Sequence, residues 1–100
     1  PAPAAPESVY VKFALFAADA RRVALAGTFN RWDPVATPLA RTGAPGVWTV
    51  TVALSVGQHQ YAFIVDGERW MVDPAAPSID DGFGRKNSVV SVSPFPGRIL

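Results

Sequence analysis

Short segments of this chain alternate apolar and polar residues, which is the pattern of half-buried β-strands. The clearest segment is 46–54, where Trp48 and three aliphatic residues fall on one face and two threonines on the other. Further strands are expected at 9–16, 22–26, 58–65 and 87–92. Ten prolines and eight glycines separate the strands, and no long stretch repeats apolar residues at helical spacing. The pattern predicts an all-β fold, an antiparallel β-sandwich of about seven strands.

The segment 58–70 has the strongest hairpin pattern in the chain. Apolar and aromatic residues flank Asp66 and Gly67, a pair that tolerates the positive φ angles of a tight turn. The core face of the first strand is expected to hold His59, Tyr61, Phe63 and Val65. Trp70 follows the turn at once, and large side chains at hairpin tips more often serve function than packing.

A second hairpin is expected near the start of the chain, because the strands at 9–16 and 22–26 are separated only by a short polar turn. The loop 27–34 follows, and it carries Trp32 outside any strand. Trp48, in contrast, has apolar neighbours within its strand and is expected in the core.

The chain is expected to form one domain of ordinary size, with 49% hydrophobic and 17% charged residues. Residues 1–8 are rich in proline and alanine, so they are interpreted as a linker. The sandwich is expected at 9–93. A proline-broken tail at 94–100 follows, with apolar residues that are expected to pack against a neighbour: Phe95, Ile99 and Leu100.

Charge and composition exclude several classes of partner. Nine basic and eight acidic residues leave no basic surface for nucleic acid. No apolar run has the 18 or more residues that a membrane span requires, so no membrane insertion is expected. The chain contains no cysteine, which suits a reducing compartment, and a cytoplasmic location is predicted.

An enzymatic function is not expected from the residues present. Two facing carboxylates would suit a glycosidase, but Asp66 fits a turn, Asp73 precedes a proline, and Glu68 is expected to be solvated. His59 is the only histidine, and no nucleophile motif accompanies it, so a structural role is assigned. We therefore expect no catalytic residues, no metal and no cofactor.

Taken together, four ordered pieces of the sequence resemble a known family. The chain is similar to the glycogen-binding module of the AMP-activated protein kinase β subunit and to the early-set domains of isoamylase and branching enzymes, which form family 48 of carbohydrate-binding modules. The resemblance implies an immunoglobulin-like early-set sandwich that binds α-1,4-glucan without catalysis. It covers roughly Val9 to Val92, and the four pieces are 25–32, 57–67, Trp70 with Asp73-Pro74, and Asn87.

The resemblance also implies which residues contact sugar. Two tryptophans would stack on glucose rings, an asparagine would hydrogen-bond hydroxyls, and neighbouring residues would shape the rim. These residues are Trp32, Trp70, Asn87, Phe83, Arg85, Lys86 and Gln60. Two positions depart from the family: Ala62 stands where the family has a lysine, and Arg85 where it has a threonine.

The sequence thus predicts a non-catalytic module that tethers a larger protein to glycogen, starch or maltooligosaccharides. Its partners would be an α-glucan and a linked or associated regulatory or enzymatic domain. The alternative is an early-set structural domain that has lost sugar binding and docks a partner protein or a neighbouring domain. Ala62, the linker at 1–8 and the apolar tail favour that alternative.

Overall fold

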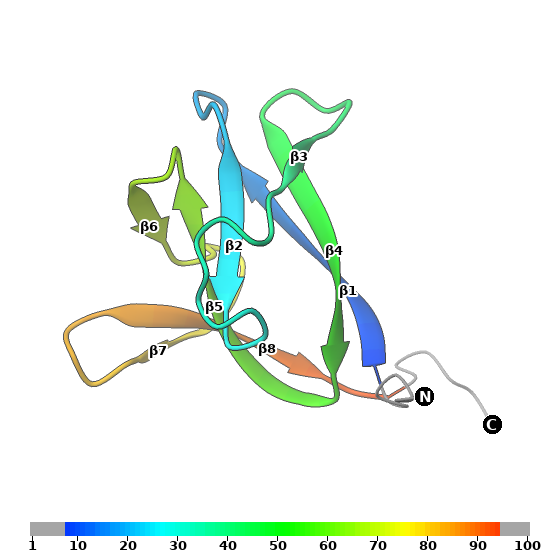
Figure 1. Cartoon of the computed structure of the whole chain (residues 1–100), viewed down its shortest axis with the longest axis vertical. Helices are drawn as coiled ribbons and strands as arrows, with labels where there is room; N and C mark the ends of the chain where they lie inside the picture. Colours follow the sequence, from blue (N-terminus) through cyan, green and yellow to red (C-terminus); the bar gives the residue numbers. More distant parts are fainter. Residues whose placement is uncertain (1–7, 95–100) are drawn as a thin grey trace.

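The computed structural model describes residues 8–94, and these residues form two antiparallel sheets packed face to face (Figure 1). One sheet has the strand order β1-β4-β3, and the other has the order β2-β5-β8-β7, with β6 paired to β5. The strands are β1 (Ser8–Phe16), β2 (Val23–Gly27), β3 (Ala40–Arg41), β4 (Val47–Ser55), β5 (Gly57–Val65), β6 (Arg69–Met71), β7 (Ser78–Asp80) and β8 (Lys86–Val92). The predicted all-β sandwich is confirmed.

Most predicted strands lie within one residue of their expected bounds. Strand β1 begins at Ser8, the last residue of the predicted linker 1–8. The rest of that linker, and Phe95, Ile99 and Leu100 of the predicted tail, lie outside the described residues. Within residues 8–94 there is no helix, and hence none that is long and apolar enough to cross a membrane.

The hairpin predicted from 9–16 and 22–26 is wrong. Strand β1 pairs with β4 along its whole length, from Ser8 opposite Ser55 to Phe16 opposite Val47. Strand β2 pairs with β5 in the other sheet. The turn between β1 and β2 therefore carries the chain from one sheet to the other, and β1 is left at the edge of its sheet with Lys12 at its middle, exposed.

The core lies between the two sheets and follows the predicted alternation. Trp48 is 4% exposed, and its indole Nε1 donates a hydrogen bond of 3.1 Å to the carbonyl of Ala17. The guanidinium carbon of Arg41 lies 4.6 Å from the centre of the Trp48 ring. The aromatic part of the core is a set of tilted or edge-to-face rings, Phe13, Phe29, Tyr61 and Phe63.

Strand β5 pairs with more strands than any other described strand. Its second half pairs with β2 and β6, and its first half pairs with β8. Tyr61, Phe63 and Val65 face the core as predicted, but Ala62 and Ile64 on the opposite face are also buried, at 4% and 1% exposure. Because both faces are covered, the second half of β5 is an apolar run rather than an alternating pattern.

Two short strands were not predicted, because a strand of two or three residues leaves no periodic pattern. Strand β3 follows a segment that crosses between the sheets: Leu25 N donates to the carbonyl of Thr37, and Leu39 N donates to that of Val23, both at 2.8 Å. Strand β7 lies within the irregular region 71–86 and pairs with β8 from Ser78 to Asp80.

A buried polar cluster holds the loop between β6 and β7 against β8. The Tyr61 hydroxyl donates to Asp73 Oδ2 at 2.6 Å, and Asp73 N donates to Ser88 Oγ at 2.6 Å. Burial raises the pKa of Tyr61 well above its usual range, and the nearby Asp73 carboxylate adds to the shift. Asp73 therefore has a structural role beyond its position before a proline.

Gly27 gives a test of how closely β2 approaches β5. A Cβ at this position would lie 2.6 Å from the backbone oxygen of Gln60 and 2.5 Å from Phe29 Cε2. We expect Gly27→Ala to lower the free energy of unfolding by about 1–3 kcal/mol, measured by urea denaturation. Gly43→Ala is the matched control, because nothing lies within 4 Å of a Cβ there. Equal stability of the two variants would contradict the close approach.

Candidate functional site

An open groove of about 1000 Å³ lies on the face of the second sheet that is turned away from the core. It is lined by residues of β5, β6 and β8, of the loop after β2 and of the loop between β7 and β8. All seven residues predicted to contact sugar lie along this groove: Trp32, Gln60, Trp70, Phe83, Arg85, Lys86 and Asn87. The structure thus brings together residues that are up to 55 positions apart in the sequence (87 − 32). Their roles in binding remain predictions.

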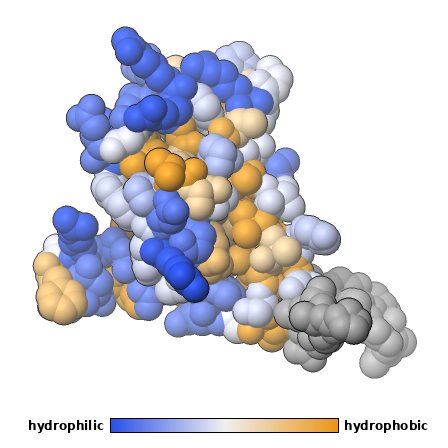
Figure 2. Space-filling model, in the orientation of Figure 1, coloured by the Kyte–Doolittle hydropathy of each residue, from blue (hydrophilic) through white to orange (hydrophobic). Residues whose placement is uncertain are grey.

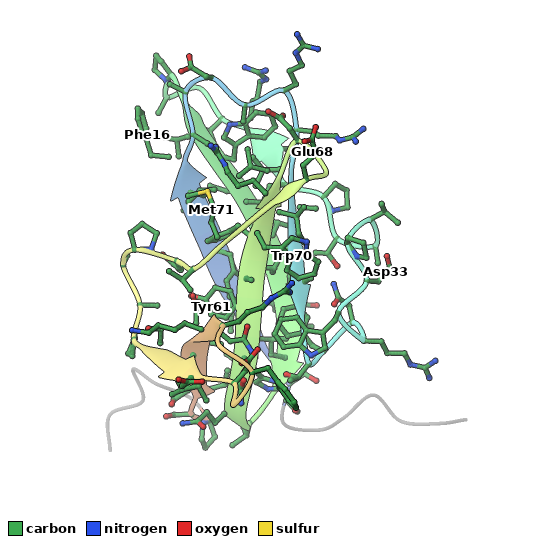
Figure 3. All side chains as sticks on the ribbon, turned by 90° about the vertical axis from the view of Figure 1, so that its left-hand side faces the viewer. Phe16, Asp33, Tyr61, Glu68, Trp70 and Met71 are labelled. Carbon is green, nitrogen blue, oxygen red and sulfur yellow. The ribbon has the colours of Figure 1, made fainter. Side chains whose placement is uncertain are left out.

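Strand β6 places Trp70 on the groove face. Trp70 pairs with Ile64 of β5, and cross-strand partners project to the same side of a sheet. The Trp70 side chain is 43% exposed, while Ile64 beside it is buried. In Figure 3, Trp70 lies on the face turned to the viewer, and the loop that carries Asp33 runs along the right-hand side of the view. Part of the indole therefore rests on the sheet, and part is open to a ligand.

The turn that leads into β6 is fixed by Asp66. Asp66 and Gly67 have φ angles of 55° and 73°, as predicted for a tight turn. The Asp66 carboxylate accepts hydrogen bonds from the backbone N–H groups of Arg21 and Arg22, at 2.7 and 3.1 Å. These bonds to the ionised form lower the pKa of Asp66 below its ordinary value of 3.8. The carboxylate thus ties the β5–β6 hairpin to the start of β2.

The loop after β2 holds Trp32 in an uncommon backbone conformation. Arg31 and Trp32 both have φ angles of 59°, which cost residues other than glycine about 1–2 kcal/mol each. Trp32 N donates a hydrogen bond of 2.9 Å to the carbonyl of Gly27. Trp32 is half-buried and Arg31 is exposed. The loop therefore directs the indole to the groove and leaves the arginine in solvent.

Asn30 supplies the hydrogen bonds that hold this conformation. Its Oδ1 accepts from Gly27 N at 2.9 Å, and its Nδ2 donates to the carbonyl of Leu25 and to Thr37 Oγ1, both at 2.9 Å. All of these partners lie in β2 or in the segment that follows the loop. One side-chain amide thus joins both ends of the loop that carries Trp32.

The β7–β8 hairpin projects from the sandwich and bears Phe83 near its tip (Figure 1). Asp81 Oδ1 accepts from the backbone N–H groups of Phe83 and Arg85, at 2.7 and 3.1 Å, and Asp80 Oδ1 accepts from Gly82 N at 2.8 Å. Figure 2 shows an isolated apolar group at this tip, and Phe83 is 90% exposed. One carboxylate oxygen of each aspartate thus stabilises the loop.

Two side-chain amides face each other on the floor of the groove. Asn87 Nδ2 of β8 donates a hydrogen bond of 3.2 Å to Gln60 Oε1 of β5. Ala62 also lines the groove, and its methyl group provides no hydrogen-bonding group where the family has a lysine. Arg85 and Lys86, both exposed, supply cationic donors on the same wall.

The sequence reasoning did not identify several other residues along the groove. They are Thr28, Glu68, Arg69, Met71, Val72 and Asp81. Glu68 and Arg69 could have been found from their place beside Trp70 in the hairpin. Thr28 has no such pattern, because its place beside the groove depends on hydrogen bonds of its backbone and its hydroxyl to the backbone of Gln60.

His59 has the structural contacts expected of it. Its Nε2 lies 2.8 Å from the carbonyl oxygen of Ser55, and its ring contacts Phe29 edge-on at 6.1 Å between centroids. In the described part of the chain, no three histidine, cysteine or carboxylate side chains gather closely enough to hold a metal ion. The groove offers indole and phenyl rings for stacking, and amide, guanidinium, ammonium, hydroxyl and carboxylate groups for hydrogen bonding.

Replacing Asn30 tests its control of the Trp32 loop. Asn30→Ala removes three hydrogen bonds and leaves buried backbone groups unpaired, so we expect a loss of about 2–4 kcal/mol in the free energy of unfolding. Asn30→Asp keeps the acceptor for Gly27 N but loses both donors, and its loss should be intermediate. Urea denaturation measures both losses, and near-ultraviolet circular dichroism should report a changed Trp32 environment. If Asn30→Ala has the stability and the circular dichroism of the wild type, the loop keeps its conformation without the hydrogen bonds of Asn30.

Acid titration tests the role of Asp66. Because the folded state lowers the pKa of this carboxyl, its contribution to stability is present above pH 3.8 and is lost as the pH falls through the lower, folded-state value. We expect Asp66→Asn to be less stable than the wild type at neutral pH and to lose less stability below about pH 4. Thermal unfolding between pH 2 and pH 7 measures this difference. If the stabilities of the wild type and of Asp66→Asn change with pH in the same way, the Asp66 carboxylate does not make this contribution to stability.

Comparison with known proteins places the sequence in a family. Residues 11–96 match a family model described as the glycogen recognition site of AMP-activated protein kinase. The chain is 35% identical to 5'-AMP-activated protein kinase subunit beta-1 of Sus scrofa over 72 residues, which are 72% of this chain and 55% of that protein. The human subunit beta-1 is also 35% identical over 72 residues, which are 25% of its length.

Enzymes are among the relatives as well. The 1,4-alpha-glucan branching enzyme GlgB 2 of Rhizobium johnstonii is 33% identical over 90 residues, which cover 85% of this chain and 12% of the enzyme. The chain thus spans about half, or much less, of the relatives that it matches. Because the family model covers most of the chain, the chain belongs to the family of the glycogen recognition site of AMP-activated protein kinase.

Proposed function

We propose that this chain is a non-catalytic module that binds α-1,4-glucan and tethers a larger protein to glycogen, starch or maltooligosaccharides. The observation that carries the proposal is the position of Trp32 and Trp70 along one groove, with Gln60 and Asn87 on its floor. Membership of a glycogen recognition family supports the choice of glucan. The 1,4-alpha-glucan branching enzymes among the relatives point to the same class of polymer.

The groove has the two kinds of surface that a sugar requires. A glucose ring presents an apolar C–H face, which stacks on a flat aromatic side chain, and a rim of hydroxyls, which seek hydrogen bonds. In the proposed complex, Trp32 and Trp70 stack on rings, and Asn87 binds hydroxyls. Phe83, Arg85 and Lys86 shape the rim. Asp81 also lines the groove, and its Oδ1 accepts two backbone hydrogen bonds within the β7–β8 loop.

The expected affinity for a short oligosaccharide is modest. One indole face and the sugar that covers it bury enough apolar area for roughly 3–5 kcal/mol, at about 25 cal/mol per Å². After the cost of association, two such contacts leave about 4–7 kcal/mol, a dissociation constant between near-millimolar and micromolar. A repeating polymer raises the effective affinity through local concentration. The module therefore serves as a tether for a linked or associated regulatory or enzymatic domain, and we expect it to act in the cytoplasm.

A second candidate is a docking domain that keeps the fold but no longer binds sugar. The outer face of the β1–β4–β3 sheet favours it, because Tyr10 and Phe16 are 80% and 69% exposed there. Ala62, in place of the family's lysine, removes one donor from the groove. The two candidates differ in which face of the sandwich binds a partner.

Co-sedimentation with glycogen tests the proposal. We expect Trp70→Ala and Trp32→Ala each to weaken retention by tenfold or more. Each substitution removes a stacking surface that contributes at least about 1.4 kcal/mol to the binding free energy, after the loss of its contacts with water is counted. Tyr10→Ala is the matched control, since Tyr10 is an exposed aromatic residue on the other sheet. Cooperative thermal unfolding of all three variants would show that the fold is intact.

The same set of variants separates the two candidates. Retention of wild type and Tyr10→Ala, with loss in both tryptophan variants, supports glucan binding through the groove. Retention that is equal in all variants refutes the site. No retention of the wild-type protein, and no change in its tryptophan fluorescence during titration with maltoheptaose, supports the docking domain.

A further inference from the structure

The amide pair on the groove floor leads beyond the list of sugar-contacting residues. Asn87 and Gln60 come from the neighbouring strands β8 and β5, and both are half-buried. Asn87 Nδ2 donates to Gln60 Oε1 at 3.2 Å. A primary amide has a donor side and an acceptor side, and this bond decides which side of Asn87 faces its neighbour. Asn87 Oδ1, an acceptor, is thereby turned away from Gln60.

The backbone of Gln60 is itself held on the side of the Trp32 loop. Its carbonyl accepts from Thr28 N at 3.0 Å, and its N–H donates to Thr28 Oγ1 at 3.4 Å. Thr28 lies at the start of the loop that carries Trp32. Gln60 therefore connects this loop to Asn87.

The free acceptor of the pair, Asn87 Oδ1, is complementary to a sugar hydroxyl. Within the described residues, the bond from Asn87 Nδ2 to Gln60 Oε1 is the only one that these two side chains make, so Asn87 Oδ1 and Gln60 Nε2 have no partner. A hydroxyl both donates and accepts, so it can give a hydrogen bond to Asn87 Oδ1. An amide that is already held by a neighbour loses less conformational freedom when it binds a ligand.

We propose that Gln60 is a positioning residue: it fixes the amide of Asn87 so that Oδ1 faces the groove and accepts a hydrogen bond from a hydroxyl of the glucan. This inference rests on the proposed function. It assigns Gln60 a role that acts through Asn87, whereas the sequence placed it among residues that contact the sugar directly. The acceptor Oε1, rather than the donor Nε2, is the atom of Gln60 that matters.

Two substitutions separate these atoms. Gln60→Glu keeps an acceptor for Asn87 Nδ2 and removes the Nε2 donor, whereas Gln60→Leu removes both. In titrations with maltoheptaose, we expect Gln60→Leu to weaken binding about 3- to 10-fold, the effect of one lost hydrogen bond. Gln60→Glu should bind within about twofold of the wild type. If Gln60→Glu loses as much affinity as Gln60→Leu, a positioning role through Oε1 is overturned.

A double-mutant cycle with Asn87→Ala supplies the second test. If Gln60 acts through Asn87, then Gln60→Leu should cost nothing further in the Asn87→Ala background, within about twofold. Independent contacts would instead give fold-changes that multiply, and this result overturns the proposal. A wild-type chain that binds no maltoheptaose overturns the proposed function, and this inference with it. If the wild-type chain binds maltoheptaose but the fold-changes of the two substitutions multiply, only the positioning role of Gln60 is overturned, and the proposed function stands.

A spectroscopic measurement distinguishes positioning from mere stability. In the free protein, the Asn87 side-chain NH₂ signals should shift and exchange faster with solvent in Gln60→Leu, and should stay close to their wild-type positions in Gln60→Glu. The thermal unfolding midpoint of each variant serves as the stability control. Unshifted Asn87 amide signals in Gln60→Leu would show that Gln60 does not hold this side chain.

Discussion

The structure depends on β5 having both faces covered. One face packs its aromatic and aliphatic side chains into the core, and the other face buries Ala62 and Ile64 beneath the groove residues. Because side chains alternate along a strand, any shift in the register of β5 would exchange these two faces. Pairing with β2, β6 and β8 prevents such a shift. The site and the core therefore share one strand, and the geometry of the groove follows from the packing of the sandwich.

The sequence predicted the strands well and their partners poorly. Alternating apolar residues indicate that a segment is half-buried, and this was enough to find β1, β4, β5 and β8. The pattern does not indicate which strand lies alongside. Strands β1 and β2 follow each other closely, yet they lie in different sheets because each pairs with a strand further along the chain, β1 with β4 and β2 with β5. Local turn chemistry was decisive only at Asp66-Gly67, where φ angles restrict the choice of residues.

The candidate site was predictable as a set of residue types, but its geometry was not. The family resemblance pointed to seven residues that the structure gathers along one groove. The residue types of Arg31 and Trp32 do not predict their left-handed backbone conformation, since neither type favours it. It follows from hydrogen bonds of Asn30 with residues on both sides of the loop. The link between Gln60 and Asn87 likewise depends on strand register, which the sequence did not reveal.

The position of β1 at the edge of its sheet affects how copies of this domain behave when they are crowded. An edge strand exposes backbone groups that a strand of another molecule can join. Lys12 is the middle residue of β1, so an antiparallel pairing of two copies in register would place Lys12 opposite its own counterpart. Two ammonium groups in such proximity repel each other. One side chain thus opposes edge-to-edge aggregation when many copies of the domain are crowded together.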